Sequence, residues 1–318
     1  METTSASSTQ YHIPNEAQKE AWAKEQVVLK KNLVLQDEHP SWSLTLRPDD
    51  THQLQHVEGL KYIGGVDLSF IVGNNEDAIA TLVILSYPDF KVVYEDHAKV
   101  KLTLPYIAGY LAFREVQPLL DLIDTMRRER IEVEPQVIMV DGCGVLHPRG
   151  FGLASHLGVL SNIPTIGCSK NYLVIDGDGA LLGSSPPVLK AAFKEYVASH
   201  PEAQGFMPLK GGVTGRVYGG ALAAATTKSA EGAQNPIFVS IGHKISLETA
   251  IVHYAADAVL VSAVLAGIKR STGLSVATNK IESEDVRSYV EKYLTVGEWV
   301  VDQGSAFMSA SQYFERKR

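Results

Sequence analysis

Three carboxylate residues stand where the sequence could build a metal-dependent catalytic site. Asp67 lies in YIGGVDLSFIV, on the opposite side of the alternation from the apolar residues. Asp141 directly follows the apolar run VIMV, and Glu115 falls at the border of an apolar stripe of helical spacing. Each also has a simpler interpretation: a solvated residue for Asp67 and Glu115, and the start of a turn for Asp141. Converging carboxylates repel one another unless a divalent cation neutralises them, so their chemistry depends on the fold.

The elements around these residues follow a recognisable order. Residues 62–72, 78–87 and 91–100 have strand character, the second with an apolar run typical of a strand buried on both faces, and short turns predict an antiparallel meander. A helix is predicted within residues 105–130, then a buried strand that ends at Asp141. The order continues with a glycine-rich loop, a short helix and the strand NIPTIGCSK. It ends with two strand-like segments (GGVTGRVYGGALAA and PIFVSIG) and two C-terminal helices.

This order is that of a ribonuclease H-like α/β fold, with a mixed sheet flanked by helices. In it the first and fourth strands are adjacent and parallel, so Asp67 should lie beside Asp141, with Glu115 arriving from the intervening helix. Oxygen ligands select Mg²⁺ or Mn²⁺, whereas the two cysteines lack the histidine spacing of a zinc site. A Mg²⁺ ion held by carboxylates on this fold is suited to cleaving phosphodiester bonds.

The composition excludes several classes of protein. Among 318 residues, 29 are basic and 36 acidic, and the net charge of −7 excludes a protein that coats nucleic acid through bulk positive charge. The two cysteines, Cys143 and Cys168, exclude a disulfide framework. The first residues lack the apolar region of a secretion signal, and no apolar run reaches the roughly 20 residues that span a bilayer. We therefore expect a protein of the cytoplasm, the nucleus or both, without a membrane partner.

Four parts are predicted along the chain. Residues 1–14 are small and polar, so we expect them to be disordered. Residues 15–60 should hold an amphipathic helix followed by a polar, proline-containing linker. Residues 61–295 are predicted to form the single ribonuclease H-like domain, and residues 296–318 a C-terminal tail without a functional signal.

Five segments, in this order, closely resemble the endonuclease V family. They are GGVDLSF, PYIAGYLAFRE, VDGCGVLHPRGFGLASHLGVL, IGCSK and SIGHKISLETA, and together they extend over roughly half of the chain. The resemblance implies Mg²⁺-dependent cleavage, with Mn²⁺ as a substitute ion, of the second phosphodiester bond on the 3′ side of inosine or deoxyinosine.

The resemblance also implies roles for individual residues. Asp67, Glu115 and Asp141 match the family's metal ligands. His243 of SIGHK matches a further active-site residue, and Lys170 of IGCSK matches a catalytic lysine at the edge of the site. For His243, a loop histidine bonded to the backbone is the simpler interpretation.

A local basic groove is needed for the substrate strand, because the net charge is negative. Side chains in such a groove bind phosphate as point charges. We expect the phosphate contacts to be Arg149, Lys170, Lys210 and Lys244. A solvated loop cation is the simpler interpretation of Arg149.

A pocket for a flipped base and a wedge for the base stack follow from the same resemblance. The predicted pocket residues are Leu111, Gly142, Gly144, His147, Gly152 and Leu173. Glycines are expected because the base edge must approach backbone N–H and C=O groups, which a Cβ atom would block. The predicted wedge is Pro105, Tyr106, Ile107 and Ala108. Its tyrosine could stack on the base left behind, although an aromatic residue that opens a buried helix is the simpler interpretation.

Departures from the bacterial pattern make the chain resemble the eukaryotic branch. Bacterial members usually carry a histidine at the position of Cys143 and a second basic residue at that of Gly150, and the family often has a proline in place of Ala108. The eukaryotic type implies a preference for inosine in single-stranded RNA. Two alternatives stay open: a repair endonuclease for deoxyinosine in DNA, and a module that binds inosine RNA without cutting it. The intact carboxylate set favours an enzyme. The sequence leaves any protein partner unknown.

Overall fold

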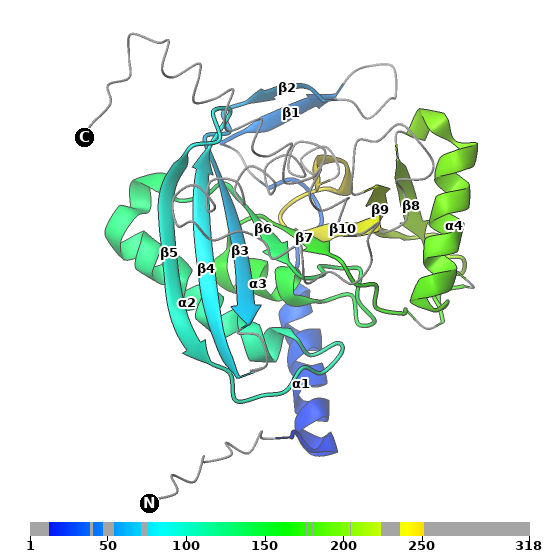
Figure 1. Cartoon of the computed structure of the whole chain (residues 1–318), viewed down its shortest axis with the longest axis horizontal. Coiled ribbons are helices and arrows are strands. Elements are labelled where there is room, and N and C mark those ends of the chain that lie inside the picture. The colour runs from blue at the N-terminus through cyan, green and yellow to red at the C-terminus, as the bar shows by residue number, and fades with distance from the viewer. Residues whose placement is uncertain are drawn as a thin grey trace, which may run out of the picture. The chain divides into compact units, whose positions relative to one another are not determined.

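The computed structural model describes most of the chain between residues 13 and 250 (Figure 1). The described ranges are 13–38, 41–46, 54–70, 76–175, 177–179, 181–203, 205–223 and 236–250. Predictions for residues 1–12, for both C-terminal helices beyond residue 250 and for the tail lie outside these ranges.

An eight-stranded mixed sheet lies at the centre of this part, in the order β5-β4-β3-β6-β7-β10-β9-β8. Its strands are β3 (Tyr62–Phe70), β4 (Asp77–Ser86), β5 (Val92–Lys101), β6 (Val137–Asp141), β7 (Thr165–Ser169), β8 (Phe206–Lys210), β9 (Val217–Ala223) and β10 (Pro236–His243). The first three form the predicted antiparallel meander, and β6 pairs in parallel with both β3 and β7. The predicted fold class, a mixed sheet flanked by helices, is confirmed.

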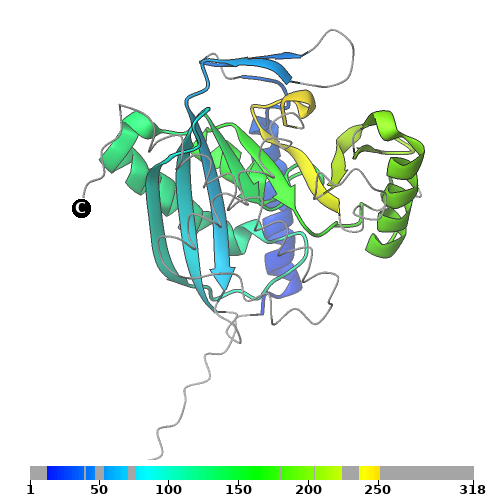
Figure 2. The same cartoon turned by 45° about the horizontal axis from the view of Figure 1, so that its top comes forward.

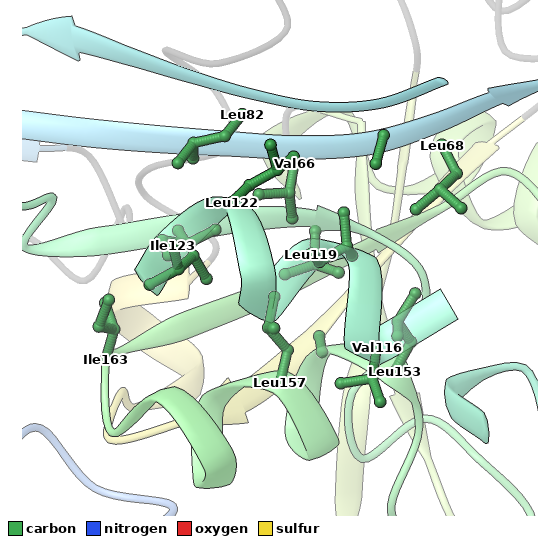
Figure 3. Packing of buried hydrophobic residues seen from close by; sticks show 14 of the residues in the cluster. Val66, Leu68, Leu82, Val116, Leu119, Leu122, Ile123, Leu153, Leu157 and Ile163 are labelled. Carbon is green, nitrogen blue, oxygen red and sulfur yellow. The ribbon is translucent and has the colours of Figure 1, made fainter. Parts of the chain in front are cut away.

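Helices α2 and α3 cover one face of the sheet and form a common core with it (Figure 3). Val66 of β3, Ile123 of α2 and Leu157 of α3 meet in this core and are almost completely shielded from solvent. Elsewhere α1 contacts α3, and α4 contacts β8. The helices are α1 (Glu16–Leu29), α2 (Ala112–Arg130), α3 (Leu153–Ser161) and α4 (Pro186–Ser199), with single 3₁₀ turns at Lys30–Asn32, Ile131–Val133 and Pro201–Ala203. Within the described ranges, no helix combines the length and apolar character that a bilayer crossing requires.

Several elements differ from the sequence-based expectations. The predicted linker contains an antiparallel hairpin, β1 (Ser43–Leu46) with β2 (Leu54–Glu58), visible above the sheet in Figure 2. Strand β4 alternates between buried and half-buried residues, so only one of its faces is fully covered. Helix α4 and strand β8 lie in a stretch for which no element was predicted. Their signal was present, because Leu189 and Phe193 have helical spacing and are both buried.

A histidine without a partner for one ring nitrogen lies on the buried side of α3. The His156 ring is 5.4 Å from that of Phe113 and 5.5 Å from that of Phe151, measured between centroids. Its side chain is almost completely buried, and no group in the described part of the chain bonds Nδ1. Burial lowers the pKa of His156 to about 4, so the folded protein holds the ring neutral.

We predict that His156→Leu reduces the loss of stability in mild acid. The unfolded chain takes up the proton near pH 6.5 but the folded chain only near pH 4, so stability falls as the pH drops through this window. Between pH 8 and pH 5 the parent should lose about 2 kcal/mol more unfolding free energy than the variant. Denaturant titrations at both pH values measure this difference, and any packing cost of the leucine cancels in it. Equal losses in the two proteins would contradict the prediction.

Candidate active site

Asp67 and Asp141 lie side by side because β3 and β6 are paired in parallel. Val66 of β3 is opposite Val140 of β6, so the next residue on each strand is an aspartate. The hydroxyl of Ser69 donates to Asp67 Oδ2 at 3.2 Å, and Lys170 Nζ lies 3.7 Å from Asp141 Oδ2. Burial raises the pKa of Asp141, the Lys170 ammonium lowers it, and the neighbouring Asp67 raises it again. The predicted pairing of these two carboxylates is therefore present at this edge of the sheet.

Glu115 approaches the same edge from the first turn of α2. Its side chain is 7% exposed, and burial raises its pKa to about 7. The guanidinium of Arg114 opposes this rise in the pKa, whereas Asp141 and Asp67 add to it. Because both aspartates act on Glu115, the structure brings all three predicted carboxylates into one electrostatic group.

The donor chemistry of this group fits a hard divalent cation. All three side chains offer carboxylate oxygens, the ligands that Mg²⁺ and Mn²⁺ prefer. Their mutual repulsion is what a cation between them would relieve. In the described part of the chain, however, no three His, Cys, Asp or Glu side chains lie close enough to form a ready-made metal cage. The carboxylates thus supply suitable ligands that would have to draw together around the ion.

A cavity of about 310 Å³ opens beside Asp141. Five of the six predicted pocket residues line it. Tyr106 of the predicted wedge and Lys170, the lysine predicted at the edge of the active site, line it as well. The predicted residues that line it are Leu111, Gly142, His147, Gly152 and Leu173. His147 forms part of this lining as a neutral ring, since burial lowers its pKa to about 4. The volume lies at the small end of ligand pockets (about 300–1,000 Å³), which suits a single heterocyclic base.

Gly144 does not line the cavity, and this prediction was wrong. A Cβ atom at Gly144 would lie 1.9 Å from the carbonyl oxygen of Ile241, so this glycine permits close packing against β10. A Cβ atom at Gly152 would likewise lie 2.2 Å from the carbonyl oxygen of Cys143, within the loop itself. These glycines are required by contacts between backbones, not by the approach of a base.

The N–H groups of the loop glycines are already used inside the protein. Gly142 donates to the Cys168 carbonyl, Gly144 to Ser240 Oγ, and Gly152 to the Gly144 carbonyl, each at 2.9 Å. They cannot donate to a bound base without breaking these bonds. In this structure, therefore, these three N–H groups are bonded within the protein, and the expected contact between a base edge and the backbone of the glycines stays a prediction.

His243 lies at the opposite end of the sheet from the carboxylates, contrary to its predicted place. It closes β10, which runs antiparallel to β7, and it is paired with Thr165 at the start of β7. Asp141, in contrast, is paired with Cys168 near the end of β7. The His243 ring is buried, and its Nδ1 accepts a hydrogen bond from the Val34 N–H at 3.3 Å. The simpler interpretation, a histidine bonded to the backbone, is the one that the structure supports.

Two of the predicted phosphate contacts, Lys244 and Lys210, lie away from Asp141 because of the directions in which β10 and β8 run. Lys244 follows His243, and its backbone pairs with residues 34 and 38. Lys210 closes β8, which runs in the same direction as β10 because both are antiparallel to β9. Both lysines therefore lie toward the end of the sheet away from Asp141. Lys170 is the predicted lysine that lies at the cavity.

Arg149 is engaged within the protein. Its Nε donates to Gln26 Oε1 at 2.6 Å, and a terminal nitrogen donates to the Gly109 carbonyl. The guanidinium also lies 4.2 Å from the centre of the Tyr110 ring. Arg149 therefore has a structural role, in which it joins three segments of the chain, and its predicted phosphate contact stays a prediction.

The predicted wedge forms a loop that leads into α2. Tyr106 is 58% exposed at the rim of the cavity, and Ala108 is exposed as well. Pro105 and Ile107 are half-buried and anchor the segment. The exposed aromatic ring beside the cavity excludes the simpler interpretation of Tyr106 as a buried helix opener.

Some lining residues were not predicted. Gln26 and Gly109 contribute to the cavity wall, as do Ser169 and Asn171 on either side of Lys170. Gln26 has no sequence signal, because a buried glutamine in a polar helix looks like a solvated one. Gly109 had one, because it directly follows the predicted wedge; its backbone is left-handed with a φ of 81°, which glycine adopts readily.

We predict that Gly144→Ala strongly destabilises the protein. The new methyl group would overlap the Ile241 carbonyl oxygen, which belongs to the sheet backbone and cannot move aside cheaply. The expected loss exceeds about 2 kcal/mol of unfolding free energy, measured by denaturant titration. Gly65→Ala is the matched control, because a Cβ atom there meets nothing within 4 Å. Equal stability of the two variants would show that the loop is not packed against β10 in this way.

Comparison with known proteins identifies the family to which the chain is similar. The sequence model of the Endonuclease V family matches residues 44–259, and that of Mitofissin matches residues 249–316. Endonuclease V of Mus musculus is 40% identical over 75% of this chain, and the match spans 63% of the mouse protein. Endonuclease V of Homo sapiens is 39% identical over 75% of this chain and 76% of the human protein.

Solved structures give the same result. The catalytic domain of human Endonuclease V superposes with a TM-score of 0.63 at 38% identity, over 77% of this chain and 89% of that one. Ciona intestinalis Endonuclease V, in complex with DNA that contains an inosine followed by a ribo-adenosine, gives a TM-score of 0.61 at 34% identity, over 75% and 88%. The resemblance inferred from the five motifs is confirmed, and it is strong toward animal members. The chain belongs to the Endonuclease V family.

Proposed function

We propose that this chain is a Mg²⁺-dependent endonuclease that recognises inosine and cleaves the second phosphodiester bond on its 3′ side. The preferred substrate in this proposal is single-stranded RNA, and Mn²⁺ can replace Mg²⁺. The observation that carries the proposal is the meeting of Asp67, Glu115 and Asp141 beside a cavity of about 310 Å³. A base held in the cavity would place its own strand across the carboxylate edge.

The residues divide the work between cleavage and recognition. Asp67, Glu115 and Asp141 would hold the metal, which supplies a Lewis acid for the phosphate and an activated water. Lys170, exposed and next to Asp141, would bind phosphate as a point charge. The cavity admits the base, and Tyr106 at its rim would stack on the base that stays in the strand.

A repair endonuclease for deoxyinosine in DNA is the second candidate. The Ciona relative was crystallised with DNA that contains an inosine followed by a ribo-adenosine. Cleavage of matched single-stranded RNA and DNA oligonucleotides, each with one inosine, separates the two candidates. Faster cleavage of the RNA supports our proposal, and faster cleavage of the DNA supports the alternative.

We predict that Asp141→Asn abolishes cleavage while the variant still binds an inosine strand. Asparagine removes the negative charge that would hold the cation, whereas the cavity and the phosphate contacts are unchanged. The expected fall in cleavage rate is at least about 1,000-fold, or roughly 4 kcal/mol of transition-state stabilisation. Gel assays with Mg²⁺ and with EDTA measure cleavage, and fluorescence anisotropy measures binding.

The matched control is Asp121→Asn, an exposed aspartate on α2 that accepts a hydrogen bond from Gln117. It should cleave like the parent. Parental activity in Asp141→Asn would remove this residue from the catalytic site. Parental activity in EDTA would remove the metal from the proposal.

We predict that Lys170→Ala reduces the salt dependence of strand binding. One lost phosphate contact changes the slope of log affinity against log salt by about 0.7 for a single strand. Lys194→Ala, an exposed lysine on α4, is the control and should leave the slope unchanged. Binding titrations at several salt concentrations measure both slopes, and equal slopes would show that Lys170 does not contact phosphate.

A further inference from the structure

Helix α1 turns a face of mixed character to the protein, with a buried glutamine at its centre. Trp22, Gln26 and, directly after the helix, Lys30 follow one another at intervals of four residues and therefore lie on one face. The Trp22 ring stacks on Phe113 at 5.0 Å, and Lys30 Nζ donates to the Arg149 carbonyl at 2.7 Å. Gln26, between them, is the buried residue of the helix. A polar side chain in such a place is costly unless its hydrogen bonds are satisfied.

The Gln26 amide satisfies its hydrogen bonds by joining separate loops. Its Nε2 donates to the carbonyls of Gly109 at 3.3 Å and Phe151 at 3.1 Å, and its Oε1 accepts from Arg149 Nε at 2.6 Å. Gly109 follows the wedge segment, whereas Arg149 and Phe151 belong to the loop that follows Asp141. We call residues 105–111 the wedge loop and residues 142–152 the pocket loop. Through Gln26, the N-terminal helix thus connects these two loops by hydrogen bonds.

Three donors converge on the carbonyl oxygen of Gly109. Besides Gln26 Nε2, they are His147 Nε2 at 3.0 Å and a terminal nitrogen of Arg149. The backbone of Gly109 is left-handed, with φ of 81°, and a Cβ atom there would lie 3.1 Å from Arg149. This arrangement, which we call the Gly109 hub, consists of Gly109, Gln26, His147 and Arg149.

The hub forms part of the cavity wall. Gln26, Gly109 and His147 all line the cavity beside Asp141, and Arg149 holds them from outside. No member of the hub is one of the three carboxylates. The shape of the cavity and the geometry of cleavage therefore depend on different sets of side chains.

We propose that Gln26 is a positioning residue for base selectivity, through which the N-terminal helix fixes the distance between the wedge loop and the pocket loop. The inference rests on the proposed function, since it assigns the selectivity of that same cavity. Gln26 acts through the hub and not on the reacting atoms, because both of its donor hydrogens and its acceptor oxygen are engaged within the protein. Loss of Gln26 should widen the range of accepted bases without removing the cleavage chemistry.

The test compares Gln26→Leu and Gln26→Glu with the parent on RNA strands that carry inosine or adenosine at one position. Leucine keeps the bulk but cannot form the three hydrogen bonds. Glutamate keeps the shape and can still accept from Arg149, but it cannot donate to the two carbonyls. We expect the ratio of kcat/KM for inosine to that for adenosine to fall about tenfold or more in both, mainly through a higher KM for inosine, with kcat within about threefold.

Two further variants separate positioning from simple destabilisation. Glu25→Gln, on the exposed side of α1, should keep the parent's ratio. Gly109→Ala, which disturbs the hub from the opposite loop, should lower the ratio as the Gln26 variants do. Thermal melting confirms that each variant is folded. A parental ratio in folded Gln26→Leu and Gln26→Glu, even with a lower melting temperature, would overturn the inference.

Binding measurements distinguish failure of this inference from failure of the proposed function. The same strands are titrated against the parent and the Gln26 variants, each carrying Asp141→Asn. If the parent with Asp141 intact does not cleave but its Asp141→Asn form binds inosine strands selectively, the proposed nuclease function fails, and the binding ratio still tests Gln26. If the parent distinguishes the strands by neither cleavage nor binding, both proposals fall.

Discussion

The adjacency of two like charges, Asp67 within β3 and Asp141 at the end of β6, is the constraint on which the site depends. Parallel pairing fixes Asp67 beside Asp141, and α2 adds the buried Glu115. The energy for holding these groups together comes from the apolar core beneath them, where α2 and α3 pack on the sheet. The fold therefore stores an electrostatic repulsion at one edge, which a cation or a proton relieves.

The carboxylates and the cavity wall are built from different parts of the chain. The carboxylates belong to the sheet and to the first turn of α2, whereas the cavity wall is built largely from loops that meet at the Gly109 carbonyl. Those loops are tied to each other and to α1 by hydrogen bonds from Gln26 and Arg149. A helix far from the carboxylates in sequence is thus part of the same structural unit.

The sequence predicted the meander, the parallel neighbour and the three carboxylates, because strand alternation and apolar runs report directly on burial. It misplaced His243, Lys244 and Lys210 because nothing in a strand's own residues shows in which direction it enters the sheet. Gln26 was missed for another reason: helical patterns are read from apolar residues, and here Val27 and Val28 are more than half exposed while the glutamine is buried. Gly144 was assigned to the pocket from the family resemblance, and the sequence does not show on which side of a loop another backbone lies.

Backbone packs directly on backbone next to the cavity. At Gly144, Gly167 and Gly242, a Cβ atom would come within 2.6 Å of another segment's main chain, and the lining residues Gly142 and Gly152 belong to the same loop as Gly144. Because glycine has no side chain that could change rotamer, a ligand that enters the cavity freezes no side-chain motion at these two lining positions. The entropic cost of binding falls instead on the exposed loop around Tyr106, which makes that loop the natural place for affinity to vary with temperature.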